Sequence, residues 1–177
     1  SLSGNGQAQS FQNGPSAMSF TNLSLVLMNN SGPSSTVAVQ LRADSGGSPG
    51  AIIETVTNAF SFVNGFPTTY DIPARGTNIL AAGTKYWIAL IWVSGDSSWR
   101  YTTTTNSTGT GTLLDADADT INSGGSWNPG NANEVFKMAV RGAQLDFGDA
   151  PSAAQSGFAA TYPVTNGARH LIGGPVL

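Results

Sequence analysis

The chain of 177 residues has only 10% charged residues, a formal net charge of -3 and no cysteine, whereas 40% of its residues are hydrophobic and Gly, Ser, Thr and Asn are abundant. These features exclude disulfide frameworks, thiolate metal sites and cysteine nucleophiles, and the lack of a basic stripe argues against nucleic acid or anionic membranes as partners. The longest apolar run is far shorter than the ~20 residues of a membrane helix, and the low lysine content favours an extracellular or cell-surface location over the cytosol.

Apolar and polar residues alternate with a period of two in the first part of the chain. The alternation predicts strands at 18–27, 37–41, 52–57 and 59–63. The segment 44–50 predicts a tight loop, because its glycines allow a positive φ and its proline removes a backbone donor. Short strands separated by regular turn signals indicate an all-β protein with an antiparallel, jelly-roll-like β-sandwich rather than a βαβ fold.

The run 85–93 is the longest apolar stretch and is β-branched and aromatic, which predicts a central strand buried on both faces. We expect 98–102 to form its antiparallel partner across a turn at 94–96. A last strand is predicted at 135–141. The alternation places eight apolar residues in the core, namely Val37, Val39, Leu41, Ile88, Leu90, Phe136, Met138 and Val140.

The composition changes at Gly142, after which Ala, Gly and Pro are frequent and alternation is weak. The sequence therefore predicts a β-sandwich domain over 1–142 and an extended tail, linker or start of a following module over 143–177. Such a segment must lie against something else to bury its apolar side chains. It either pairs in trans with a neighbouring subunit or packs in cis as the start of a module. The apolar residues expected at that subunit interface are Val164, Leu171, Ile172 and Val176.

Four motifs of the first part occur together: LRADSGGSPG (41–50), LAAGTKYWI (80–88), GGSW (124–127) and FKMAVRG (136–142). With them, residues 7–142 resemble the choice-of-anchor family of bacterial extracellular β-sandwich domains. The resemblance implies a jelly-roll-like sandwich in a secreted or surface-anchored protein, and it implies no catalytic residue.

The tail contains DFGDAP (146–151), a Tyr-Pro pair at 162–163 and NGARH (166–170). These motifs are similar to the opening of a GEVED-type module, which occurs in large modular surface proteins. The acidic end of that module is absent from the sequence. The resemblance therefore implies a setting, a modular surface protein, rather than a ligand.

Three aspartates, Asp115, Asp117 and Asp119, are the sharpest chemical feature of the sequence. Alternate residues of a strand lie on one side, where three carboxylates repel one another unless a cation or water screens them. The loop lacks the glycine and the glutamate that an EF-hand requires. The pattern leaves two interpretations open, a Ca²⁺ site and a solvated acidic loop.

Aromatic residues offer a second candidate site. Trp99, Tyr101 and Trp127 lie beside predicted loops, and exposed rings can stack on the apolar faces of sugars. They therefore define a possible carbohydrate-binding platform. The alternative interpretation is that these rings belong to the sandwich core or anchor loops.

Residues suited to catalysis are few. The only histidine, His170, has no acid or nucleophile at a recognisable spacing, and nothing supports Glu54 and Glu134 as members of a glycosidase pair. We therefore expect a non-enzymatic structural or adhesive module, a building block of a bacterial surface fibre, sheath or large adhesin. Its expected partners are copies of itself or neighbouring modules. The alternative is a carbohydrate-binding module that binds a polysaccharide.

Overall fold

The computed structural model describes residues 5–104, 107–130, 134–146 and 170–171, and these residues contain strands but no helix. All strand pairs are antiparallel. In chain order the strands are β1 (Gly6–Gln12), β2 (Met18–Ser45), β3 (Ser48–Phe62), β4 (Thr68–Pro73), β5 (Ile79–Leu80), β6 (Lys85–Trp99), β7 (Tyr101–Thr102), β8 (Thr112–Thr120), β9 (Asn128–Pro129), β10 (Val135–Phe136), β11 (Met138–Asp146) and β12 (His170–Leu171).

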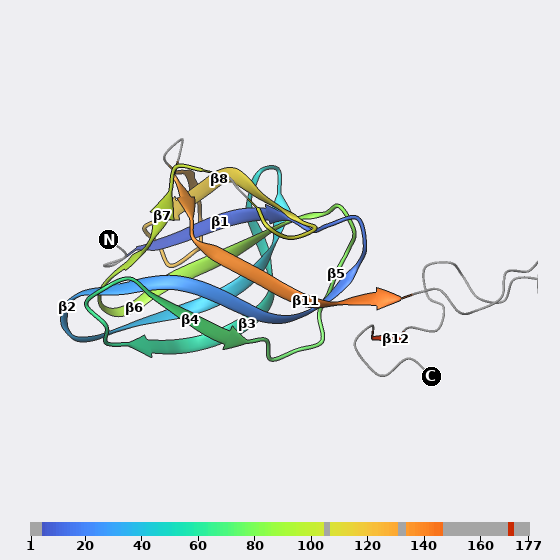
Figure 1. Ribbon diagram of the computed structural model, residues 1–177. Helices are drawn as coiled ribbons and strands as arrows, with labels where there is room; N and C mark the ends of the chain where they lie inside the picture. Colours follow the sequence, from blue (N-terminus) through green and yellow to red (C-terminus); the bar gives the residue numbers. More distant parts are fainter. Residues whose placement is uncertain (1–4, 105–106, 131–133, 147–169, 172–177) are drawn as a thin grey trace, which may run out of the picture.

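Two long paired strands, β2 and β6, pass together from one layer of the molecule to the other (Figure 1). Residues 36–43 of β2 pair with 86–94 of β6, and 27–31 of β2 pair with 96–99 of β6. The ladder is irregular between these two parts, where Gly32 and Gly95 both have a φ of 79°. Such a φ is accessible to glycine without steric cost, so the two glycines permit the bend.

The bend creates two layers. The first layer consists of six neighbouring segments, which are in order β3, the second half of β2, the first half of β6, β1, β8 and β9. In the second layer, the first half of β2 lies between β4 and β5 on one side and β11 on the other. The predicted all-β, antiparallel β-sandwich is therefore confirmed.

The main core fills the space between the layers. Of the eight core residues predicted from alternation, six are buried in it: Val37, Val39, Leu41, Ile88, Leu90 and Phe136. Met138 and Val140 are half-buried and pack against the same core. Residues that alternate along β2, such as Leu23, Leu25 and Leu27, face the core from the second layer. The period-two pattern thus identifies the residues that face the core in both halves of β2.

The central strand is buried on both faces, as its composition predicts. Tyr86, Ile88 and Leu90 face the main core, whereas Trp87 and Ala89 belong to a second cluster on the outer face of the first layer. Ala8, Ala118 and half-buried Trp127 complete that cluster. The segment after β8 therefore covers the outside of the first layer, so the sheet has apolar contacts on both of its sides.

Two predictions of strand limits are wrong. No hairpin turns at 94–96, because β6 continues through this segment and residues 97–99 pair with β2 rather than with 85–93. The strand predicted at 135–141 also ends later than expected, because β11 continues through Gly142 to Asp146, and the domain division after residue 142 stays a prediction. Close packing with β2 explains the glycine at this position, because a Cβ on Gly142 would lie 2.5 Å from the Ser19 carbonyl oxygen.

Candidate functional site

Among the residues that the structure describes, β11 has one edge that is open over most of its length. Residues 138–144 pair with β2 on one side. On the opposite side, the sheet order places β12, which pairs with Leu145 and Asp146. Within the described parts of the chain, no strand pairs with 138–144 on that opposite side. An open strand edge presents unpaired N–H and C=O groups, which are a template for another strand.

The backbone groups at this edge can be assigned residue by residue. The Lys137 carbonyl accepts from Val26 N at 3.2 Å, and Leu145 N donates to the Ala17 carbonyl at 3.1 Å. Odd-numbered residues of β11 therefore bond to β2. The ladder between β2 and β11 has a single register shift, at which Thr21 of β2 has no partner on β11. The extra residue is therefore on β2, and β11 itself is regular. Because backbone groups alternate between the two edges of a strand, residues 138, 140, 142 and 144 direct theirs to the open edge.

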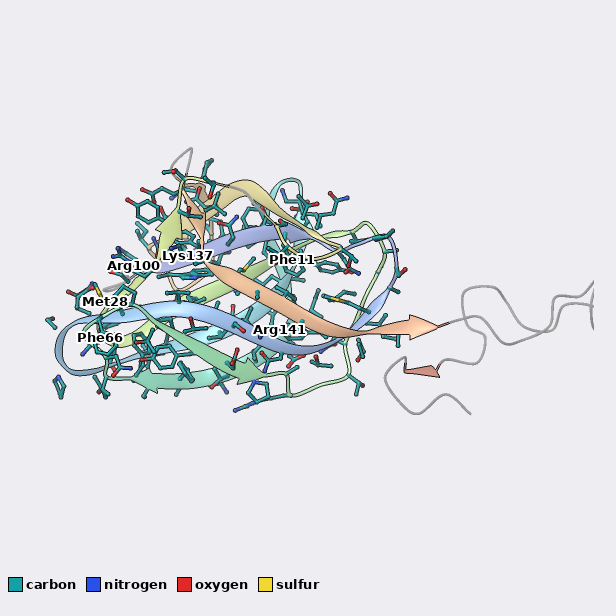
Figure 2. The ribbon with its side chains drawn as sticks, viewed as in Figure 1. Phe11, Met28, Phe66, Arg100, Lys137 and Arg141 are labelled. Atoms are coloured by element: carbon teal, nitrogen blue, oxygen red, sulfur yellow. The ribbon has the colours of Figure 1, made fainter. Side chains whose placement is uncertain are left out.

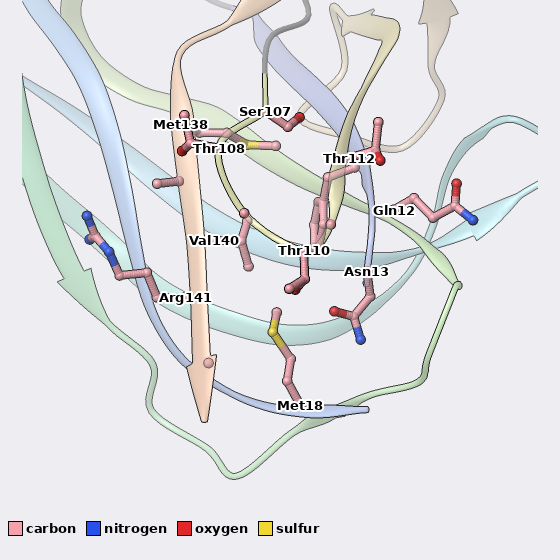
Figure 3. A pocket seen from close by; sticks show the side chains of 15 residues that line it. Gln12, Asn13, Met18, Ser107, Thr108, Thr110, Thr112, Met138, Val140 and Arg141 are labelled. Carbon is pink, nitrogen blue, oxygen red and sulfur yellow. The ribbon is translucent and has the colours of Figure 1, made fainter. Parts of the chain in front are cut away.

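A groove of about 530 Å³ runs beside this edge (Figure 3). One wall is β11 and the other is the segment 107–112, with the end of β1 between them. Figure 3 shows Val140 and Met18 directed into the groove, opposite Thr110, while Arg141 is directed away from it. Phe11 and Met138 add further apolar surface. The groove therefore exposes part of the space between the layers along the edge of β11.

Glycines hold the far wall close to β1. A Cβ on Gly111 would lie 2.6 Å from the Gln12 carbonyl oxygen, and a Cβ on Gly14 would lie 2.7 Å from Thr110 Oγ1. Backbone therefore meets backbone at this wall, with little side chain between. The remaining side chains of the wall are small hydroxyls, including Thr108 and Thr112. This composition leaves room in the groove for side chains from elsewhere.

On the outer face of the second layer, a polar network ties three strands together. Ser24 of β2 donates a hydrogen bond to Asp71 of β4, and Arg141 of β11 donates to both of them. The hydrogen bond from Ser24 holds the pKa of Asp71 below its ordinary value, and Arg141 adds to the effect against a smaller opposing contribution from burial. Asp71 thus accepts hydrogen bonds from both Ser24 and Arg141, and the three side chains connect β4, β2 and β11.

A shallow depression of about 430 Å³ adjoins this network and is lined by Lys137, Arg141 and threonines 69, 102 and 104. Figure 2 shows Arg100 and Lys137 next to each other, where Lys137 N donates to the Arg100 carbonyl at 2.7 Å. The depression therefore lies where the end of β6 meets β11. Its lining supplies hydroxyls and positive charge but no pair of groups suited to acid–base chemistry.

The three aspartates predicted as a metal site all fall on β8, but the strand is irregular there. Gln7 lies opposite Asp119 and Gln9 opposite Asp117, whereas residues 114–116 all stand opposite Ser10. Asp115 therefore lies in the irregular part of the ladder between β1 and β8. Among the residues that the structure describes, no group of three His, Cys, Asp or Glu could hold a metal ion. The Ca²⁺ site stays a prediction.

One of the three rings of the predicted aromatic platform is buried. Trp99 is only 2% exposed, because its ring stacks on Phe136 and its Nε1 donates to the Lys137 carbonyl at 3.0 Å. Trp99 is therefore a core residue and not part of an exposed platform. Tyr101 is 48% exposed on β7. Trp127 packs on the second cluster, with the Arg42 guanidinium 5.4 Å from its ring centroid. The two remaining rings thus belong to different parts of the sandwich.

The remaining candidate residues are placed as follows. Leu171 lies on β12, opposite Leu145 of the same chain, and His170 lies opposite Asp146. Val164, Ile172 and Val176 lie outside the described residues. Glu54 is buried and accepts hydrogen bonds from Arg75 N, Gly76 N and Asn78 Nδ2. Glu54 therefore anchors the segment between β4 and β5 and has a structural role.

Sequence reasoning missed the open edge of β11. The strand itself was predicted, but its position at the side of the sandwich depends on which strands pair with β2, and alternation carries no information about that. Comparison with known proteins adds no further assignment, since no family model, curated protein or solved structure matches the chain. In the described part of the chain, no helix is long and apolar enough to cross a membrane. The open edge of β11 and the groove beside it are therefore the features that bear on function.

Proposed function

We propose that the chain is a non-enzymatic structural or adhesive module of the bacterial cell surface, a building block of a fibre, sheath or large modular adhesin. Its C-terminal segment pairs with a neighbouring subunit by strand addition. The observation that carries this proposal is the open, regular edge of β11 beside a groove lined by both apolar and hydroxyl-bearing side chains. In strand addition, main-chain hydrogen bonds supply affinity and pockets for alternate side chains supply the register.

The other edges of the sandwich support this proposal by contrast. Proteins protect exposed edges with bulges, prolines or very short strands. The ladder of β3 with β2 shifts register four times, β4 ends at Pro73, and β9 has two residues of which one is Pro129. β11 has nine residues and none of these features. The edge that lies beside the groove is thus the one suited to accept a strand.

Truncation tests the proposal. A chain that ends at Asp146 keeps all of β11 but lacks the segment 147–177. We expect the full chain to assemble into oligomers or fibres in electron microscopy and sedimentation, and the truncated chain to stay a folded monomer with a β-type circular dichroism spectrum. A truncated chain that assembles as well as the full chain would refute strand addition by the tail.

A further inference from the structure

We propose that Asn64 deamidates spontaneously in the folded protein, whereas the fold protects the asparagines of the other described Asn-Gly pairs. The sequence contains Asn-Gly at 5–6, 13–14, 64–65 and 166–167, and the first three pairs lie in the described part of the chain. Asparagine is thermolabile, and it deamidates most readily before glycine, which has no side chain to hinder the attacking backbone nitrogen. The turn that contains Asn64 shares no residue with the groove beside β11.

The reaction needs no enzyme and no reactant other than water. The backbone nitrogen of Gly65 loses its proton to solvent and attacks the side-chain carbonyl carbon, Cγ, of Asn64. A bond forms between this nitrogen and Cγ, the bond between Cγ and Nδ2 breaks, and Nδ2 takes up a proton and leaves as ammonia. The five-membered succinimide ring that remains is then opened by water at either carbonyl. The products are aspartate and isoaspartate, each of which carries a new negative charge.

The surroundings of Asn13 oppose this reaction. Asn13 is only 6% exposed, and its Nδ2 donates hydrogen bonds to the carbonyl oxygens of Ser16, Leu80 and Ala81 at 3.0–3.2 Å. The proton that Gly14 N must lose is itself donated to Asn13 Oδ1 at 2.9 Å, in a buried hydrogen bond. Both the leaving group and the attacking nitrogen are therefore held by the fold and shielded from solvent.

The first pair is protected by the sheet. Gly6 lies in β1 between two partner strands, opposite Ile91 of β6 and Thr120 of β8. A Cβ on Gly6 would lie 2.8 Å from Thr120 Cγ2, and the Asn5 carbonyl accepts a hydrogen bond from Trp92 N at 2.9 Å. Closure of the succinimide ring requires the main chain at Asn5 to leave its extended form. This change would disrupt the start of β1 on both of its sides.

Asn64 has neither kind of protection. Asn64 and Gly65 lie between β3 and β4, outside both strands, and Gly65 is exposed. Apart from its chain neighbours, the one atom within 4 Å of a Cβ on Gly65 would be the Asn29 carbonyl oxygen, at 3.8 Å. The attacking nitrogen is therefore open to solvent. The Asn64 side chain donates from Nδ2 to Thr68 Oγ1 at 3.2 Å, which keeps Cγ folded back along the same turn.

The modified turn contacts the bend of β2. The Asn64 carbonyl accepts a hydrogen bond from Asn29 N at 2.8 Å. Buried Asn29 in turn donates from Nδ2 to the Gly32 carbonyl and accepts from Ser35 Oγ. In isoaspartate the main chain runs through the side-chain carbon and is one atom longer. Deamidation therefore changes both the charge and the length of a turn that is bonded to the bend.

Incubation of the full chain at mildly alkaline pH and physiological temperature tests the proposal. Peptide mapping by mass spectrometry locates each replacement of an amide by a carboxyl group, and it resolves every Asn-Gly pair separately. We expect the Asn64 peptide to convert with time and the Asn5 and Asn13 peptides to stay unchanged. In a denaturant, where the fold no longer protects them, Asn5 and Asn13 should convert as readily as Asn64.

Gly65→Ala is the matched variant. Gly65 is not among the residues with a positive φ, and a Cβ fits there, so the variant should keep the melting temperature of the wild type. The added methyl group hinders the attacking nitrogen, and most of the conversion at Asn64 should be lost. An unchanged Asn64 peptide in the wild type, equal conversion of Asn13 in the folded chain, or full conversion of Asn64 in Gly65→Ala would each overturn the proposal.

Discussion

The indole ring of Trp99 stacks on the phenyl ring of Phe136, with ring centroids 4.8 Å apart and ring planes 18° apart. The two residues are more than thirty positions apart in the sequence and belong to β6 and β10. Both side chains are buried. The contact therefore joins the end of the long β6 strand to the segment that enters β11, the strand that carries the candidate site.

This contact predicts a large stability effect at Trp99. Replacement of a buried large aromatic residue by alanine typically costs about 3–5 kcal/mol, so Trp99→Ala should lower the free energy of unfolding by that amount in urea titrations. Tyr101→Ala is a matched control, because its ring is exposed two residues further on, and it should change stability by less than about 0.5 kcal/mol. Equal losses in both variants would show that Trp99 does not have the core role described above.

Asp44 predicts a pH dependence of stability. Burial raises the pKa of this carboxyl. Hydrogen bonds from Trp87 Nε1 and Gly47 N and the charge of Lys85 together lower it by a larger amount, so the pKa lies below its ordinary value. A carboxyl whose folded-state pKa is lowered stabilises the protein above its unfolded pKa of about 3.9, and this contribution disappears as the pH falls through the folded-state value.

The variant Asp44→Asn should therefore be less stable than the wild type at pH 7. The difference in unfolding free energy between the two proteins should shrink as the pH falls below about 4. Urea titrations at several pH values measure this difference. Because the salt bridge between Lys85 Nζ and Asp44 Oδ1 is 3.4 Å long and partly exposed, added salt should also reduce the difference. A stability difference that is the same at pH 7 and pH 3 would contradict the assignment.

The predicted calcium site at Asp115, Asp117 and Asp119 has its own test. If Ca²⁺ binds the folded chain, a concentration of about 100 times the dissociation constant adds roughly 2.7 kcal/mol of stability. We expect a chelator to lower the melting temperature of the wild type and to have no effect on the triple Asp→Asn variant. Identical melting curves of the wild type with and without chelator would leave the interpretation of a solvated acidic loop.

The carbohydrate alternative makes a different prediction from the structural one. With Trp99 buried, only Tyr101 and Trp127 remain as candidate rings, and they lie in different parts of the sandwich. We expect soluble polysaccharides to leave the mobility of the chain in affinity gels unchanged. A retardation that Tyr101→Ala or Trp127→Ala abolishes would favour the carbohydrate-binding function.

Alternation predicted the parts of the fold in which one strand face is buried. Val37, Val39 and Leu41 were assigned to the core correctly, because a half-buried strand must place its apolar residues at every second position. A tight turn was predicted correctly within 44–50, since Gly46 and Gly47 have φ values of 62° and 88° and Gly47 N donates to Asp44 Oδ2. The turn is shorter than predicted, because β2 continues to Ser45 and β3 starts at Ser48. These features depend on local sequence alone.

Features that depend on long-range pairing were not predictable in the same way. The segment 94–96 has the composition of a hairpin turn, yet β6 continues through it because β2 bends beside it and offers partners on both sides of the bend. Trp99 resembles an exposed aromatic residue in sequence, and only its contact with distant Phe136 shows that it is buried. The open edge of β11 and its groove likewise arise from the order of strands.

The bend of β2 and β6 also decides how the module would respond to a mechanical load. Gly6, at the start of β1, pairs with Ile91 near the bend, whereas β11 leaves the sandwich at the opposite end (Figure 1). A pull on the two ends of the sandwich is therefore directed along the strands. Under such a shearing force the hydrogen bonds of a ladder share the tension and must break together, whereas a force across the strands would open them one at a time. We therefore expect the paired course of β2 and β6 to resist tension applied along the strands.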